Sequence, residues 1–205
     1  MKNNISLIVL LSCLLPTFSI VAVDLETGEI GSAGGSCIAG SIIISDIHPG
    51  TGAIHTQSYW MSANQGNASD LMDDGYSPEE IIQYLENNDI SNNPYIRQYG
   101  IVDLYYGNNY GYLLEEECDD IMNTSWSGEI GSGELGECTD NPISRSAGFT
   151  GENCMVWRGH IEGISYAIQG NILLSEDVLL QMENNFINTN GPLDRKLMAS
   201  LQGAN

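Results

Sequence analysis

The sequence predicts a mixed α+β fold in which two stacked sheets carry helices on both outer faces. Four strand-like segments come first and are followed by two helical segments. Three further strand-like segments are then followed by two final helical segments. Because the helices fall into two separate blocks of the chain, the compact arrangement places one block on the outer face of each sheet.

The first two strands are predicted to form a hairpin. Residues 17–24 read TFSIVAVD, residues 25–29 supply a polar turn, and the glycine-rich segment EIGSAGGSC returns as a strand. Apolar residues occupy both alternating sets of positions in the first strand, which is typical of a strand that is covered on both faces. We therefore expect an inner strand with Phe18, Ile20 and Ala22 on one face and Ser19, Val21 and Val23 on the other.

The remaining elements follow from turn and capping signals. Residues 41–47 and 50–60 form a second hairpin around HPGTG. Later strands are predicted at 96–106, 146–151 and 164–173, and helices at 64–75, 77–89, 175–189 and 192–202. Ser77, Pro78 and Glu80 predict a capping box at the start of the second helix, and Ser175 is the predicted N-cap of the third.

The N-terminus predicts export, because an apolar run follows Met1 and Lys2. We interpret residues 1–16 as a signal peptide or lipoprotein signal and residues 17–205 as a single domain of a bacterial protein that is secreted, periplasmic or at the cell surface. Three positions remain open for the first residue of the mature chain. Cleavage before Thr17 follows a proline, cleavage before Val23 best fits the small-residue rule but removes the first strand, and LLSC resembles a lipoprotein box that would anchor Cys13 to lipid.

The charge of the chain excludes several classes of partner. Asp and Glu number 27 against 6 Lys and Arg, which gives a formal net charge of −21. Such a surface repels phosphate backbones and anionic lipids, so we expect no nucleic-acid partner. No later segment is apolar enough to span a membrane. The partner that remains is a small-molecule or peptide substrate, and the sequence leaves an oligomer open.

From about residue 107 to residue 146 the composition changes to mainly Gly, Asn, Ser and Glu, and we interpret this segment as an acidic insertion. The exported chain keeps four cysteines, which allow three pairings. We expect Cys118 to pair with Cys138 inside the insertion. Cys37 is either a second candidate nucleophile or the partner of Cys154 in a disulfide, and the pairing of these two cysteines stays open. No cysteine or histidine spacing is typical of a metal site, so we expect no metal and no cofactor.

Several motifs together resemble the bacterial family called domain of unknown function 1028. They are TFSIVAVD-x-ETGE-x-G, G-x-G-A-I-H-T-Q, RQYGIVD, FTGENC and W-x-GH-x-x-G-x-x-YAIQGNIL, in that order over residues 17–104 and 146–203. The resemblance implies the four-layer αββα sandwich of the N-terminal-nucleophile (Ntn) hydrolases. Family members usually continue beyond the position of LQGAN and have a shorter loop at the insertion.

The implied fold makes Thr17 the candidate catalytic residue, because Ntn hydrolases carry their nucleophile where this strand begins. A free α-amine on such a residue acts as the general base for its own side chain. The alternative interpretation of Thr17 is an ordinary β-branched strand residue. No lysine lies between Lys2 and Lys196 to lower the pKa of that amine, and arginine does not exchange a proton.

Polar residues within these motifs are the candidate substrate-binding residues: His55, Gln57, Arg97, Gln169 and Asn171. His55 alternates with Gln57, and Gln169 with Asn171, so the members of each pair share one face of a strand. Buried polar side chains need partners, so these residues either pair with one another between the sheets or face a cleft. We also expect Arg97 to pair with Asp103. Two functions follow: an exported Ntn-type hydrolase that cleaves an amide or peptide-like bond, or a non-catalytic ligand-binding or surface-structural protein on the same scaffold.

The cysteine pairing gives a first prediction. Closing the loop between Cys118 and Cys138 should stabilise the oxidised protein by about 3 kcal/mol through loss of chain entropy in the unfolded state. Peptide mapping of the non-reduced, exported protein should recover the two cysteines in one linked peptide pair. Recovery of either one linked to Cys37 would show that the pairing is wrong.

Overall fold

The computed structural model describes residues 16–105 and 142–204, which form a mixed α+β fold with two antiparallel sheets. One four-stranded sheet has the order β2-β1-β8-β7 and is called sheet A; the other has the order β3-β4-β5-β6 and is called sheet B. The strands of sheet A are β1 (Thr17–Val23), β2 (Ile30–Gly35), β7 (Gly159–Gly163) and β8 (Tyr166–Asn171). The strands of sheet B are β3 (Ser45–His48), β4 (Gly52–Gln57), β5 (Gln98–Tyr105) and β6 (Ile143–Thr150).

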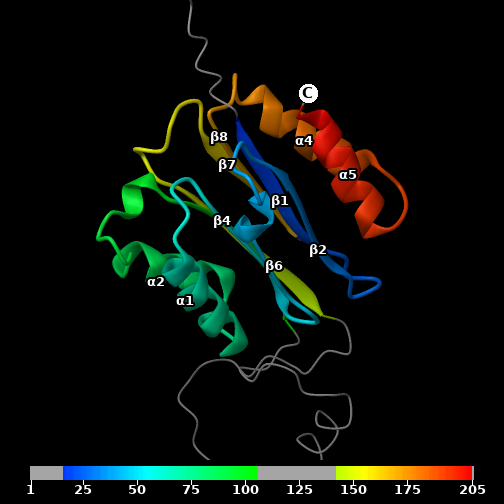
Figure 1. The fold of residues 1–205 in the computed structure, drawn as a ribbon. Coiled ribbons are helices and arrows are strands. Elements are labelled where there is room, and N and C mark those ends of the chain that lie inside the picture. Colours follow the sequence, from blue (N-terminus) through cyan, green and yellow to red (C-terminus); the bar gives the residue numbers. More distant parts are fainter. Residues whose placement is uncertain (1–15, 106–141, 205) are drawn as a thin grey trace, which may run out of the picture.

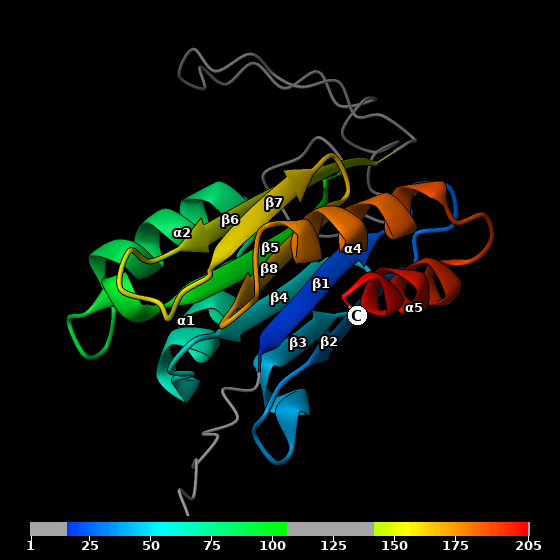
Figure 2. The ribbon, with the colours of Figure 1, turned by 90° about the horizontal axis from the view of Figure 1, so that it is seen from above.

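The α-helices of the described residues form two pairs. Figures 1 and 2 show α1 (Ser62–Asp73) and α2 (Pro78–Asn87) beside sheet B, and α4 (Asp177–Asn188) and α5 (Leu193–Gly203) beside sheet A. Two short 3₁₀ helices, η1 (Ser41–Ile44) and η2 (Pro94–Ile96), lie in the connections. None of the helices in this part of the chain is long and apolar enough to cross a membrane.

Three apolar clusters hold these elements together. One lies between sheet A and the α4–α5 pair, a second between sheet B and the α1–α2 pair, and a third between the two sheets. The third cluster is made of small and β-branched side chains for the most part: Val21, Val23, Ala53, Val102, Leu104 and Ala167. Both faces of each sheet are therefore packed.

Strand β1 is an inner strand, as its sequence predicts. It pairs with β2 on one side and with β8 on the other. Ile20 and Ala22 lie in the cluster beneath α4 and α5, whereas Val21 and Val23 lie between the sheets. Ser19 shares that inner face and donates a hydrogen bond to Gln57 of sheet B at 2.8 Å.

The predicted capping residues at the start of α2 are confirmed, whereas the N-cap of α4 differs from the predicted one. The Ser77 hydroxyl accepts from the Glu80 backbone N–H, and the Glu80 carboxylate accepts from the Ser77 N–H, which completes the predicted capping box. In α4 the N-cap is Glu176 and not Ser175. The Ser175 hydroxyl instead accepts from the Asp177 N–H at 3.2 Å, so it stabilises the turn that precedes the helix.

The main differences between the predicted and the observed strands concern the edges of the sheets. Residues 41–44, predicted as part of a strand, form η1, and the edge strand β3 begins at Ser45. Strand β6 begins at Ile143, so residues 143–146 belong to sheet B and not to the insertion predicted at 107–146. Strand β7, with the sequence GHIEG, was not predicted. An edge strand needs few apolar residues, and in β7 only Ile161 packs against an apolar cluster. Residues 1–15 of the predicted signal, which include Cys13, lie outside the described residues, as do Cys118 and Cys138.

The position of β1 predicts that the fold cannot tolerate its loss. A chain that begins at Val23 would open sheet A between β2 and β8 and lose several buried side chains, each worth roughly 1.5–3 kcal/mol. This loss approaches or exceeds a typical stability of about 5–15 kcal/mol once ladder hydrogen bonds are lost too. Circular dichroism should show a cooperative melt for a chain that begins at Thr17 and none for one that begins at Val23. A cooperative melt of the shorter chain would overturn the inner role of β1.

Candidate functional site

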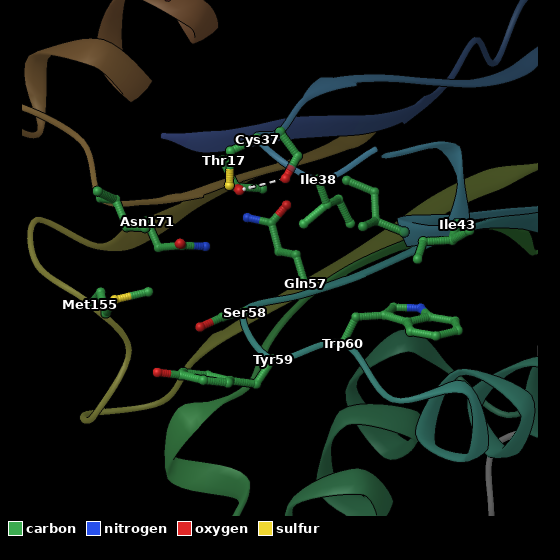
Figure 3. Close-up of a pocket in the computed structure, with 13 residues that line it drawn as sticks. Thr17, Cys37, Ile38, Ile43, Gln57, Ser58, Tyr59, Trp60, Met155 and Asn171 are labelled. Atoms are coloured by element: carbon green, nitrogen blue, oxygen red, sulfur yellow. Dashed lines mark hydrogen bonds between the residues drawn. The ribbon is translucent and has the colours of Figure 1, made fainter. Parts of the chain in front are cut away.

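A cavity of about 400 Å³ lies at the end of the sheets where β1 begins (Figure 3). Three strand ends meet there. Thr17 opens β1, Asn171 closes β8 directly opposite Thr17, and Gln57 closes β4 of the other sheet. The rest of the lining comes from η1 and the connections around it: Ser36, Cys37, Ile38, Ile43, Ile44, Ser58, Tyr59, Trp60, Met155 and Ile172.

Thr17 contributes its side chain to this cavity while being largely buried. Its Oγ1 lies 2.9 Å from Oγ of Ser36, so the two hydroxyls share a hydrogen bond. The thiol of Cys37 lines the same cavity (Figure 3). A hydroxyl held by another hydroxyl keeps its lone pairs oriented, which suits a nucleophile once a base is available.

The amide groups of Gln57 and Asn171 are held by one residue, Gln98. Nε2 of Gln57 donates to Oε1 of Gln98 at 2.6 Å, and Nδ2 of Asn171 donates to the same oxygen at 3.0 Å. Nε2 of Gln98 donates in turn to the carbonyls of Gly159 and Gly170 in sheet A, both at 2.9 Å. Each NH₂ group carries two donors, so Gln57 and Asn171 each keep a second N–H beside the cavity.

Gln98 is a site residue that the sequence reasoning missed. It lies within the RQYGIVD motif, and it alternates with Gly100 on the strand, as Gln57 alternates with His55. The same rule of alternating polar strand residues therefore applies to Gln98. The sequence gives no sign that this side chain, rather than its neighbour Arg97, connects the two sheets.

His55 and Gln169 lie between the sheets, outside the lining of this cavity. Nε2 of Gln169 donates to Oγ of Ser19 at 2.6 Å and lies 3.4 Å from Nδ1 of His55. Gly100 makes room for this amide, because a Cβ at that position would lie 1.8 Å from Oε1 of Gln169. His55 also borders a separate cavity of about 160 Å³.

Burial controls the protonation of His55. Only 1% of the residue is exposed, and desolvation lowers its pKa from 6.5 to about 3. The imidazole is therefore neutral at neutral pH. Together with the paired amides, it forms a polar layer without formal charge between the sheets.

Arg97 lies behind the cavity wall and does not line the cavity. Its Nε donates to Oδ2 of Asp89 at 2.7 Å, and its guanidinium also donates to the carbonyl of Tyr59. Burial acts to raise the pKa of Asp89, but hydrogen bonds from Arg97 and its other neighbours hold that pKa well below the ordinary value. The predicted Arg97–Asp103 pair is wrong: Asp103 binds Arg145, which lies opposite it on β6.

Cys37 and Cys154 do not form a disulfide, since both cysteines are free. Cys154 is buried, and its Sγ lies 3.2 Å from the carbonyl oxygen of Arg97, to which it donates. Cys37 is exposed at the cavity. The described residues contain no cluster of His, Cys, Asp and Glu that is suited to holding a metal ion.

Comparison with known proteins gives the family. The family of unknown function DUF1028 matches residues 17–120 and 141–205. The chain belongs to this family. The crystal structure of protein SPO2555 from Silicibacter pomeroyi, also assigned to DUF1028, is similar with a TM-score of 0.67 and 21% identity, over 92% of this chain and 67% of that one. This similarity shows a shared fold, and none of the curated proteins compared with the chain matches it.

The buried histidine of this DUF1028 protein predicts a pH dependence of stability. Below pH 6.5 the unfolded state binds a proton at His55 that the folded state excludes, so stability is lost as the pH falls toward about 3. Urea unfolding between pH 7 and pH 4 should show a smaller loss for His55→Gln than for the wild type. The slopes should differ by up to about 1.4 kcal/mol per pH unit. Equal slopes would show that His55 is protonated in the folded state.

Proposed function

We propose that this protein is an exported Ntn-type hydrolase that cleaves an amide or peptide-like bond, with Thr17 as the nucleophile. The observation that carries the proposal is the position of Thr17. It is the first residue of an inner strand, and its side chain lines a cavity with two oriented amides. The pairs of helices outside two face-to-face sheets support the αββα sandwich of the Ntn hydrolases as the scaffold.

The proposed chemistry requires removal of residues 1–16. The new α-amine of Thr17, with an ordinary pKa near 7.7–8.0, would accept the proton of Oγ1 as Oγ1 attacks the substrate carbonyl. The amine would then return that proton to the leaving nitrogen as the amide C–N bond breaks. Water activated by the same amine would cleave the resulting ester and regenerate Thr17.

Gln57 and Asn171 would stabilise the charge that develops on the carbonyl oxygen. One N–H of each amide is directed to Gln98, and the second N–H is the one that would donate to the carbonyl oxygen. Donors with fixed orientation stabilise an oxyanion without reorganising during the reaction. Arg97 would act indirectly, by holding the backbone at Tyr59.

One observation favours the second candidate function, a non-catalytic ligand-binding protein on this scaffold. Lys196 is the only lysine of the described residues, and its Nζ lies 3.4 Å from Oδ2 of Asp24. Asp24 follows β1 at the end opposite Thr17. A free amine at Thr17 would therefore have no lysine beside it to lower its pKa, and burial of the amine would have to do so.

The start of the mature chain and the reactivity of Thr17 together test the proposal. Intact mass spectrometry of exported protein should give a chain that begins at Thr17. A β-lactone, which acylates nucleophilic hydroxyls, should then label Thr17 in the wild type. Thr17→Ser should keep the labelling, and Thr17→Val should lower its rate at least about a thousandfold.

Two outcomes would reject catalysis by Thr17. A mature chain that begins at Cys13 or Val23 would lack the required amine. A chain that begins at Thr17 but resists labelling would have the amine without the chemistry. Either result favours the ligand-binding alternative.

A further inference from the structure

We propose that the cavity at Thr17 takes a neutral amide with an aliphatic acyl group, and that the apolar part of the cavity holds that acyl group. The choice of an acyl amide rests on the proposed function, because attack by Thr17 bonds the acyl carbon to Oγ1. Oγ1 belongs to the cavity wall, so the acyl group is the part of the substrate that the cavity must hold. The preference for a neutral, aliphatic ligand rests only on the residues that line the cavity, and not on the proposed function.

The side chains of the lining carry no formal charge. Among the 13 described residues that line the cavity there is no Asp, Glu, Lys, Arg or His, although the whole chain has a net charge of −21. A carboxylate ligand would find no cationic side chain in the wall and would be repelled by the protein as a whole. The α-amine of a chain that begins at Thr17 would also lie at the wall, and it is uncharged above its ordinary pKa near 7.7–8.0. An ammonium ligand would find no carboxylate in the wall. A neutral ligand meets neither penalty.

Several apolar side chains gather at one end of the cavity, although Met155 lies at the other end, on the same side as Asn171. In Figure 3, Ile38, Ile43 and Trp60 lie on the other side of Gln57 from Asn171. An amide at the Thr17 end would therefore meet hydrogen-bonding partners, while a chain attached to its carbonyl carbon would extend along apolar side chains. This division matches a ligand that is polar at one end and apolar at the other.

The apolar wall is held in place by hydrogen bonds to the side chains of Gln65 and Arg97. Nε1 of Trp60 donates to Oε1 of Gln65 at 2.5 Å, and Arg97 donates to the carbonyl of Tyr59. Ser58 and Tyr59 have positive φ angles of 59° and 57°, a backbone conformation that the surrounding contacts must maintain. A wall that is fixed before the ligand arrives loses little conformational entropy on binding.

Large apolar side chains also remain exposed around the cavity. The exposed fractions are 40% for Ile43, 56% for Tyr59 and 41% for Met155. Apolar residues gathered at a cavity on an otherwise acidic protein are typical of a surface that contacts a ligand. They give a longer acyl chain further apolar surface to bury.

The inference is tested by measuring ligand binding to the exported protein that carries Thr17→Val. This variant lacks the proposed nucleophile, so binding is measured without cleavage of the ligand. Calorimetry at about pH 9, where the α-amine at residue 17 is uncharged, should show octanamide binding at least about tenfold more tightly than octanoate, octylammonium or acetamide. Ile43→Asp should weaken octanamide binding at least about tenfold. Ile47→Asp is the matched control, because Ile47 is 38% exposed but does not line the cavity, and it should leave binding unchanged.

The outcomes separate this inference from the proposed function. Octanamide binding that survives in Thr17→Val, with no lactone labelling of the wild type, would reject catalysis and keep the ligand class. Labelling of the wild type with equal affinity for octanamide and octanoate would keep catalysis and overturn the ligand class. Unchanged octanamide binding in Ile43→Asp would also overturn it.

Discussion

The end of the sheets that holds the cavity depends on the hydrogen bonds of the Gln98 carboxamide. It stands on sheet B, donates to two backbone carbonyls of sheet A, and accepts from Gln57 and Asn171. A buried polar group left without a partner costs about 1–3 kcal/mol, so removing this carboxamide would leave several groups unpaired at once. At the other end, small apolar side chains hold the sheets together. Beside the cavity the two sheets are therefore joined by hydrogen bonds, and the interior between them is otherwise largely apolar. Further hydrogen bonds link the edges of the sheets, such as those from Ser146 to the Gly163 carbonyl and between Ser32 and Ser45.

Antiparallel pairing brings the site residues together from distant parts of the chain. Because β1 and β8 run in opposite directions, the first residue of β1 lies opposite the last residue of β8. Strand β4 ends at Gln57 opposite the start of β5 at Gln98. Each sheet thus contributes a pair of facing residues, and the hydrogen bonds of Gln98 connect the pairs. A shift of one residue in either register would turn these side chains to the opposite faces.

The sequence predicts the faces of strands better than it predicts the partners of polar side chains. The alternation in β1 and the capping box of α2 are local patterns, and both agree with the structure. Edge strand β7 has too few apolar residues to produce such a pattern. The partner of Asp103 is fixed by the pairing of β5 with β6, which the sequence does not reveal. Alternation placed Gln57 and Asn171 on inner faces, but only the structure shows which of the polar residues reach the cavity.

The charge of this protein and the chemistry of its site are separate features. The acidic residues give the surface its charge, whereas the layer between the sheets uses carboxamides, hydroxyls and a neutral imidazole. Neutral amides do not titrate, so the donors beside the cavity keep their orientation over a wide pH range. The Arg97–Asp89 ion pair lies behind the wall, where it fixes backbone without placing charge in the cavity. Such a site recognises its ligand by shape and by directed hydrogen bonds, and the acidic surface acts on it only as a field that repels anions.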